Sequence, residues 1–303
     1  MIIGVMGPEG SYSEKAANLW TAKCALYGAE LRYFPDIEDT LLAAVQKKSD
    51  FSIIPVENSI EGSVGITLDL LLEEDVRIVG EVVVKVEHCL LAKGRIEDIR
   101  IILSHPQGLA QCRHFLKNHF PGTELRSTGS TSHAARLAGE FEEMAAIASP
   151  EAAECYKLKT LLSNIQDRKE NYTRFIVLKS REKDPKSGEK DPEKQFLIST
   201  VPENLNQTYG IFPFKTSLII YLEKDRPGAL YEILGAFAKR KINLTKIESR
   251  PSKKELGDYY FYIDFEGHTS DVLIKDALED IKVKVDTLKV LGSYPAFKSK
   301  QKT

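Results

Sequence analysis

Short apolar segments rich in β-branched side chains alternate with amphipathic segments through the first 180 residues. The apolar segments predict strands, at residues 2–6, 50–56, 99–103, 145–148 and 173–178. The segments between them predict helices, at residues 14–20, 66–72, 109–119, 134–141 and 150–157. Strands that alternate with helices in this way predict an α/β fold with parallel sheets.

The last third of the chain has a different order of elements. Strands are predicted over residues 217–222, 244–247, 259–265 and 283–291. Helical spacing produces one apolar stripe between the first two strands, made of Leu230, Ile233, Leu234, Phe237 and Ala238. A second helix is marked by Ile274, Leu278 and Ile281. The resulting order, βαββαβ, is the ferredoxin-like arrangement.

Polar side chains gather where the predicted strands of the first two-thirds end. Asn58 and Ser59 follow one strand, Gln107 follows another, and Thr131 and Ser132 lie in a hydroxyl-rich turn before a helix. Ligands of open α/β sheets bind beyond the carboxyl ends of the strands, so these positions predict a ligand site. His105, beside Gln107, is a candidate either for a general acid or for ordering its loop.

The loop over residues 7–13 leads from the first strand into the first helix. Ser11 and Glu14 have the spacing of a capping box. Backbone N–H groups at such a helix start favour an anion, and a carboxylate fits best. The loop is neither a Gly-x-Gly-x-x-Gly motif nor a P-loop, which argues against a dinucleotide or ATP.

Residues 171–178 contain the side chains that we expect to be at the centre of the ligand site. Its β-branched and aromatic residues predict a strand. Successive side chains of a strand point to opposite faces, so Thr173 and Phe175 share one face and Arg174 points the other way. The Thr173 hydroxyl could act as a weak acid, and the neighbouring Phe175 ring could pack against the apolar ring of a ligand.

Composition excludes several classes of protein. The chain has 303 residues, 42% hydrophobic content and a net charge of −2, which predicts two or three ordinary domains and no attraction to nucleic acid or anionic lipid. No apolar run approaches the roughly 20 residues of a membrane span, and the N-terminus does not resemble a signal peptide. The four scattered cysteines fit buried thiols in the cytoplasm better than a disulfide framework or a metal site.

A set of motifs in fixed order resembles the prephenate dehydratase family. The segments are GPEGSYS (7–13), VENSIEGS (56–63), SHPQ (104–107), STS (130–132), AAIAS (145–149) and TRF (173–175). Further on, GAL (228–230) and ESRP (248–251) resemble the phenylalanine-sensing ACT domain of the same enzymes. The resemblance implies two lobes similar to type II periplasmic binding proteins, with the site in the cleft between them.

The domains that follow from this resemblance are a catalytic unit over residues 1–180, a charged linker over 181–214, an ACT domain over 215–295 and a tail over 296–303. The first strand begins at residue 2, so we expect no appended chorismate mutase domain and a monofunctional enzyme. The activity implied is the decarboxylating dehydration of prephenate to phenylpyruvate, without metal or cofactor.

We expect Thr173 to donate a hydrogen bond to the leaving hydroxyl and Phe175 to pack on the substrate ring. Arg174 would brace the polar cluster from the adjacent face, and Glu57 is the alternative acid, because burial could raise its pKa. The carboxylates and the keto group of prephenate would be held by Ser11, Asn58, Ser59, Gln107, Thr131 and Ser132.

The ACT resemblance implies that L-phenylalanine binds between two subunits of a homodimer or homotetramer and regulates turnover. The effector residues expected are Gly228, Ala229, Leu230, Glu248, Ser249, Arg250 and Pro251. Two alternatives stay open at this point: an arogenate dehydratase, and a non-catalytic amino-acid sensor with the same domains.

Overall fold

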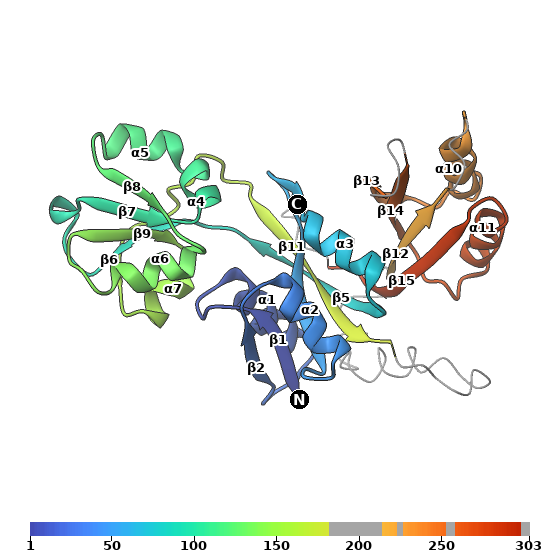
Figure 1. The fold of residues 1–303 in the computed structure, drawn as a ribbon, viewed down its shortest axis with the longest axis horizontal. Helices are drawn as coiled ribbons and strands as arrows, with labels where there is room; N and C mark the ends of the chain where they lie inside the picture. Colours follow the sequence, from blue (N-terminus) through green and yellow to red (C-terminus); the bar gives the residue numbers. More distant parts are fainter. Residues whose placement is uncertain (182–213, 223–226, 253–257, 298–303) are drawn as a thin grey trace, which may run out of the picture.

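The computed structural model describes residues 1–181, 214–222, 227–252 and 258–297. These residues form two α/β lobes and a C-terminal domain in a row, with the first lobe in the middle (Figure 1). Within these ranges no helix is long and apolar enough to cross a membrane. Most of the predicted linker 181–214 and tail 296–303 lies outside the described residues.

The first lobe is built on a mixed sheet with the strand order β2-β1-β3-β11-β5, in which β4 pairs with β3. Its strands are β1 (Ile2–Met6), β2 (Glu30–Phe34), β3 (Phe51–Asn58), β4 (Gly62–Ser63), β5 (Val76–Lys85) and β11 (Tyr172–Ser180). Its helices are α1 (Tyr12–Lys23), α2 (Ile37–Val45) and α3 (Gly65–Glu73). Side chains buried on both faces of this sheet, such as Ile53 and Ile54, explain why the strands read as apolar runs.

The second lobe has a sheet with the order β10-β6-β9-β7-β8. Its strands are β6 (Cys89–Ala92), β7 (Ile101–Ser104), β8 (Glu124–Ser127), β9 (Met144–Ala148) and β10 (Lys159–Leu162). Its helices are η1 (Ile96–Asp98), α4 (Pro106–Gln111), α5 (Arg113–His119), α6 (Thr131–Ala138) and α7 (Pro150–Cys155). Residues 86–88 and 163–171 connect the two lobes, and a hydrogen bond from the backbone N–H of Val86 to the carbonyl of Asn171 holds these segments together.

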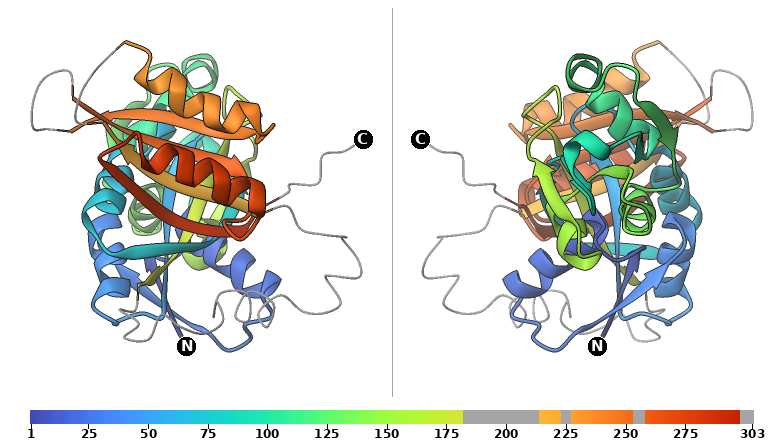
Figure 2. Two further views of the ribbon diagram at one scale, coloured as in Figure 1. Left: turned by 90° about the vertical axis from the view of Figure 1, so that its right-hand side faces the viewer. Right: turned by 90° about the vertical axis from the view of Figure 1, so that its left-hand side faces the viewer.

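The C-terminal domain has the order βαββαβ. Its elements are β12 (Phe214–Tyr221), α10 (Ala229–Lys239), β13 (Leu244–Pro251), β14 (Tyr259–Glu266), α11 (Val272–Lys282) and β15 (Thr287–Pro295). The strands form an antiparallel sheet in the order β13-β14-β12-β15. Both helices cover its outer face (Figure 2) and enclose a core that includes Phe237, Phe265 and Ile274.

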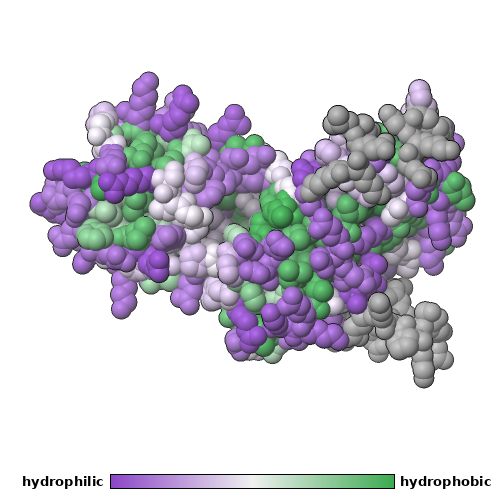
Figure 3. Space-filling model, viewed as in Figure 1, coloured by the Kyte–Doolittle hydropathy of each residue, from purple (hydrophilic) through white to green (hydrophobic). Residues whose placement is uncertain are grey.

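The inner face of this sheet packs on the first lobe. One hydrophobic core contains Leu68 and Ile78 of the first lobe together with Ile219, Tyr262 and Leu291 of the C-terminal domain. In the view of Figure 3, hydrophobic side chains also gather on the surface of the first lobe around α3. The first lobe and the C-terminal domain therefore share a hydrophobic core, so that more than the linker joins them.

Polar and backbone contacts fix the same interface. Lys289 donates from Nζ to the carbonyls of Leu71, Leu72 and Glu74 at 2.8 to 2.9 Å, and so caps the C-terminal end of α3. Gly292 has a φ of +153°, and a Cβ there would lie 2.2 Å from the carbonyl oxygen of Ile78. Only glycine fits this approach of β15 to β5.

The predicted α/β fold with two lobes and a C-terminal βαββαβ domain is confirmed. The prediction of parallel sheets is wrong for part of each lobe, because β11 runs antiparallel to β3 and β5, and β6 runs antiparallel to β9 and β10. These strands lie beside the connections between the lobes, where the chain returns in the opposite direction. The predicted helix 109–119 is two helices that meet at Cys112, and β2, α2, β8 and β10 were not predicted.

Candidate active site

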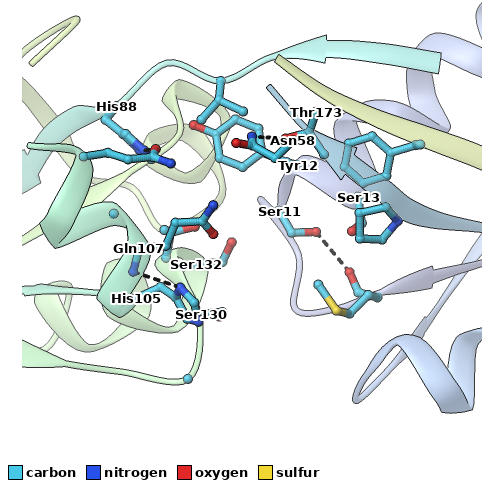
Figure 4. Close-up of a pocket in the computed structure, with 18 of the residues that line it drawn as sticks. Ser11, Tyr12, Ser13, Asn58, His88, His105, Gln107, Ser130, Ser132 and Thr173 are labelled. Carbon is cyan, nitrogen blue, oxygen red and sulfur yellow. Dashed lines mark hydrogen bonds between the residues drawn. The ribbon is translucent and has the colours of Figure 1, made fainter. Parts of the chain in front are cut away.

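A cavity of about 220 Å³ lies between the two lobes, with walls from both (Figure 4). Most of the residues predicted to bind or transform a ligand line it. These are Ser11, Asn58, Gln107, Thr131, Ser132, Thr173 and Phe175. Segments far apart in the sequence thus meet at one place, as their positions after strands predicted.

The N-termini of two helices reach the cavity from opposite lobes. Ser11 caps α1 by accepting the backbone N–H of Glu14 at 3.3 Å, and Ser130 caps α6 by accepting the N–H of His133 at 3.0 Å. The Glu14 carboxylate accepts the backbone N–H of Gly10, one residue before the N-cap, at 2.6 Å, rather than the N–H of Ser11 that a capping box uses. The next backbone N–H groups of each helix have no partner within the helix, so each end attracts an anion.

The pairing of β11 with β3 decides which side chains face the cavity. Thr173 lies opposite Asn58, and Arg174 lies opposite Glu57. Because side chains alternate along a strand, Thr173 and Asn58 reach the cavity and the other pair points to the far side of the sheet. The Asn58 amide Nδ2 donates to Thr173 Oγ1 at 3.0 Å.

Arg174 and Glu57 are therefore not part of the cavity wall. This is the adjacent face on which Arg174 was expected to lie, but it places Glu57, the alternative acid, away from the cavity. Arg174 forms ion pairs with Asp264 of the C-terminal domain at 2.8 Å, with Glu57 at 3.1 Å and with Glu81 at 3.3 Å. Burial disfavours its charge, but Asp264 and the other acidic groups outweigh burial and raise the pKa of Arg174. Side chains alternate along β3 as they do along β11. Glu57 therefore points away from the cavity that its neighbour Asn58 faces, just as Arg174 points away from the face of Thr173.

Ser59 also stands outside the cavity lining. Its backbone N–H donates to the carbonyl of Tyr172, and its hydroxyl accepts the N–H of Tyr172 at 2.9 Å. These two bonds hold the end of β11 against the loop after β3. The structure therefore gives Ser59 an ordering role beside the site.

A buried chain of side-chain hydrogen bonds continues from Asn58. Its Nδ2 lies 2.9 Å from Asn171 Oδ1, and Asn171 Nδ2 donates to Gln111 Oε1 at 2.9 Å. The same oxygen of Gln111 lies 2.9 Å from His88 Nε2. The chain joins the first lobe, both connecting segments and α4 of the second lobe.

His88 and Gln111 line the cavity, and neither was predicted from the sequence as a site residue. Gln111 lies one helical turn after Gln107, so the spacing of the two residues could have identified it. Burial lowers the pKa of His88, only partly offset by its hydrogen bond to Gln111, which favours a neutral imidazole. The His88 ring packs edge to face against Tyr12, and the residue is 3% exposed.

His105 lines the cavity as the cap of α4. Its Nδ1 accepts the backbone N–H of Gln107 at 3.3 Å, and this contact matches the loop-ordering alternative. Across the described ranges, no group of three or more His, Cys, Asp or Glu side chains could hold a metal ion.

The predicted effector segments lie at two places in the C-terminal domain. Gly228 caps α10 with a φ of 87°, followed by Ala229 and Leu230 in the helix. Glu248 and Arg250 of β13 face the first lobe, where they bind Ser63 Oγ at 3.0 Å and Asp69 at 3.1 Å. Strand alternation places Ser249 and Pro251 on the opposite face of β13, and both are exposed.

Comparison with known proteins agrees with this architecture. Residues 3–183 match the family model of prephenate dehydratase, and residues 216–283 match that of the ACT domain. The chain is 38% identical to a prephenate dehydratase of Methanocaldococcus jannaschii, covering 96% of both chains. It is 38% identical to arogenate dehydratase/prephenate dehydratase 2 of Arabidopsis thaliana, covering 97% of this chain and 72% of that relative.

A solved prephenate dehydratase from Arthrobacter aurescens, in complex with L-Phe, matches with a TM-score of 0.80 at 29% identity. The match covers 99% of this chain and 93% of that one. With the cavity between its lobes and the C-terminal βαββαβ domain, the chain belongs to the prephenate dehydratase family of lyases and carries an ACT domain.

Proposed function

We propose that the chain converts prephenate to phenylpyruvate with Thr173 as the hydrogen-bond donor to the leaving hydroxyl. The observation that carries this proposal is the contact between Asn58 Nδ2 and Thr173 Oγ1, at 3.0 Å. An amide nitrogen donates and does not accept, so the Thr173 oxygen is the acceptor in this contact. The hydroxyl hydrogen of Thr173 is thereby directed elsewhere, and the residue lines the cavity.

The reaction breaks two bonds of prephenate and makes its ring aromatic. The electron pair of the bond to the ring carboxylate enters the ring as CO2 leaves, and the bond to the ring hydroxyl breaks. The departing hydroxide takes a proton and leaves as water, and Thr173 regains its proton from solvent. Because aromatisation supplies the driving force, the enzyme has to supply orientation and a proton, and a positioned acid contributes about 10²–10⁴-fold.

The helix ends of α1 and α6 are suited to the two carboxylates of prephenate. They approach from opposite lobes, next to Ser11 and Ser130 respectively. One carboxylate at each helix end would place the ring between the lobes, where Phe175 and Pro55 provide apolar wall. Gln107, Thr131 and Ser132 would then bind the carboxylate and keto group of the side chain on the second lobe.

We assign no acid–base role to Glu57 and no substrate contact to Arg174. Both take part in the ion cluster on the far side of β11. Arg174 instead ties the strand that carries Thr173 to the ACT domain.

Measuring phenylpyruvate by its absorbance after prephenate is mixed with purified protein tests the activity, and absence of product would favour the amino-acid sensor. The Thr173→Ala variant tests the role of the hydroxyl. We expect kcat to fall by about 10²-fold or more, while Thr173→Ser retains part of the rate. A Thr173→Ala enzyme with near wild-type turnover would refute the assignment.

Arogenate is the second candidate substrate, because a relative of similar identity is named for both activities. It carries an amine where prephenate carries a keto group, and the elimination is the same. Comparing kcat/KM for the two substrates decides between them, and we expect the larger value for prephenate.

We propose that L-phenylalanine binds the ACT domain at the helix start Gly228–Leu230 and at the strand end 248–251, and regulates turnover. Its effect can reach the site through Ser63, whose hydroxyl bonds both Glu248 and Lys246 of β13. Ser63 lies in β4, which pairs with β3 at Glu57 and Asn58. The coupling between the effector site and the active site is reciprocal. An active-site ligand that favours a different state of the chain from the one phenylalanine favours should therefore weaken phenylalanine binding.

Isothermal titration with L-phenylalanine and its effect on kcat test this regulation. We expect the Ser63→Ala variant to bind the effector but to respond less. No binding, or binding without any change in turnover, would refute the proposal.

The proposal includes a homodimer or homotetramer in the cytoplasm, acting on small molecules without a nucleic-acid or membrane partner and without a cofactor. All four cysteines are free, as a reducing compartment allows. Light scattering at several concentrations measures the assembly.

A further inference from the structure

The orientation of the Asn58 amide is fixed by the backbone. Its Oδ1 accepts the N–H of Ile60 at 2.9 Å and the N–H of Glu61 at 3.1 Å. Backbone N–H groups only donate, so the atom facing them must be the amide oxygen. The Nδ2 atom of Asn58 therefore faces the other way, toward Asn171 and Thr173.

This orientation determines each following partner in turn. Because Asn58 Nδ2 donates, the Asn171 atom at 2.9 Å must be its oxygen, and Asn171 Nδ2 then donates to Gln111. The Gln111 atom at that contact must be its oxygen, which also lies 2.9 Å from His88 Nε2. An amide oxygen cannot donate, so His88 carries a hydrogen on Nε2.

The chain ends in two buried polar atoms at the cavity wall. Among the described residues, His88 Nδ1 and Gln111 Nε2 have no hydrogen-bond partner. In the neutral Nε2–H tautomer, His88 Nδ1 is a bare acceptor. The bonds therefore converge on Gln111. The donors run from the backbone at residues 60–61 through Asn58 and Asn171 to its Oε1, and His88 Nε2 donates to the same oxygen from the other side.

We propose that Asn171, Gln111 and His88 act as positioning residues, through a hydrogen-bond relay that converges on Gln111 Oε1, crosses between the lobes and sets α4 relative to Thr173. The proposal rests on the proposed function, because its kinetic consequence is the turnover of prephenate. Asn171 holds Gln111, the last residue of α4, and His88 holds the same oxygen from the connecting segment. The start of α4 presents His105 and Gln107 to the cavity, so the relay sets their distance from Thr173.

The tautomer of His88 is the direct test, and it needs no substrate. In the full chain labelled with ¹⁵N-histidine, two-bond ¹H–¹⁵N spectra identify the tautomer of each ring. The His88→Gln variant assigns the His88 signal, and the other five histidines are internal controls. We expect a neutral Nε2–H tautomer, whereas an Nδ1–H tautomer would overturn the relay.

Kinetics test whether the relay positions the site. Asn171→Leu keeps the branching of the side chain at Cγ and removes the relay bonds, so we expect kcat to fall about tenfold with KM changed less than about threefold. His88→Leu should also lower kcat, and His88→Gln should restore it, because a glutamine amide can donate from the position of Nε2. Full turnover in Asn171→Leu, or equal losses in His88→Gln and His88→Leu, would overturn the proposal.

The double variant Asn171→Leu/His88→Leu adds a check, because members of one relay act as a unit. The kcat of the double variant should be no lower than that of the less active single variant. If the losses of activation free energy in the two single variants add fully in the double variant, the proposal is overturned. A wild-type chain that does not turn over prephenate would overturn the proposed function. An Nδ1–H signal in an active wild-type chain would overturn the relay alone.

Discussion

The ion cluster between β11 and the ACT sheet allows a quantitative test of how the ACT domain is held. Arg174 Nη2 lies 2.8 Å from Asp264 Oδ2, and their side chains are 13% and 9% exposed. The Asp264→Asn substitution keeps the shape of the side chain and removes its charge. Ser217, which donates to Asp264 Oδ1 at 2.5 Å, can still donate to the amide oxygen.

The magnitude follows from the charges that remain. The cluster contains three cations and three carboxylates, namely Arg174, Lys215, Lys246, Glu57, Glu81 and Asp264. Removing one partner of a buried ion pair costs about 3–5 kcal/mol when the other charge is left alone. Arg174 keeps two carboxylates, so we expect a loss of about 2–3 kcal/mol, close to one charge-assisted hydrogen bond.

Urea unfolding of the wild type and Asp264→Asn at one pH measures this loss. Asp98→Asn is the matched control, because it removes the same charge from an exposed ion pair with Arg95. We expect no measurable change in the control. Equal stability of the two variants, or stabilisation by Asp264→Asn, would refute the idea that the cluster fastens the domains together.

Three further predictions concern other parts of the molecule. Gly292→Ala should lower the free energy of unfolding by about 3 kcal/mol through overpacking. Gly235→Ala, in open space within α10, should raise the free energy of unfolding by about 0.5–1 kcal/mol. A lower urea midpoint for Gly235→Ala than for Gly292→Ala would contradict this. Lys289→Met should lower stability by about 2 kcal/mol by leaving carbonyls of α3 uncapped, and an unchanged melting curve would refute the cap. Burial lowers the pKa of His88 from 6.5, so on acidification the unfolded chain binds a proton first. The free energy of unfolding should therefore fall as pH drops below about 6.5. His88→Gln should reduce this dependence of stability on pH, and an unchanged dependence would contradict a lowered pKa of His88.

Periodicity was sufficient for the elements with a clear apolar pattern. It predicted β1, β3, β9 and α3, together with all the elements of the ACT domain, to within a few residues. It missed β8, whose four residues are all exposed, because an edge strand without a buried face has no alternation to detect. It also missed α2, although Asp36 caps this helix by accepting the N–H of Asp39.

The site was predictable as far as local signals reach. Strand ends and helix caps identified Ser11, Asn58 and Thr131, which the fold brings to one cavity. The contacts of Arg174 depend on the ACT sheet, which follows it by many residues, so no local pattern could show them. The buried relay depends equally on partners such as His88 and Asn171 that meet only in the folded chain.

The most direct test of the central claim is the kcat of Thr173→Val at saturating prephenate. Valine keeps the shape of threonine and lacks only the hydroxyl that Asn58 orients. We expect a kcat at least about 10²-fold below wild type, with correct folding verified by circular dichroism. A kcat within about twofold of wild type would contradict it.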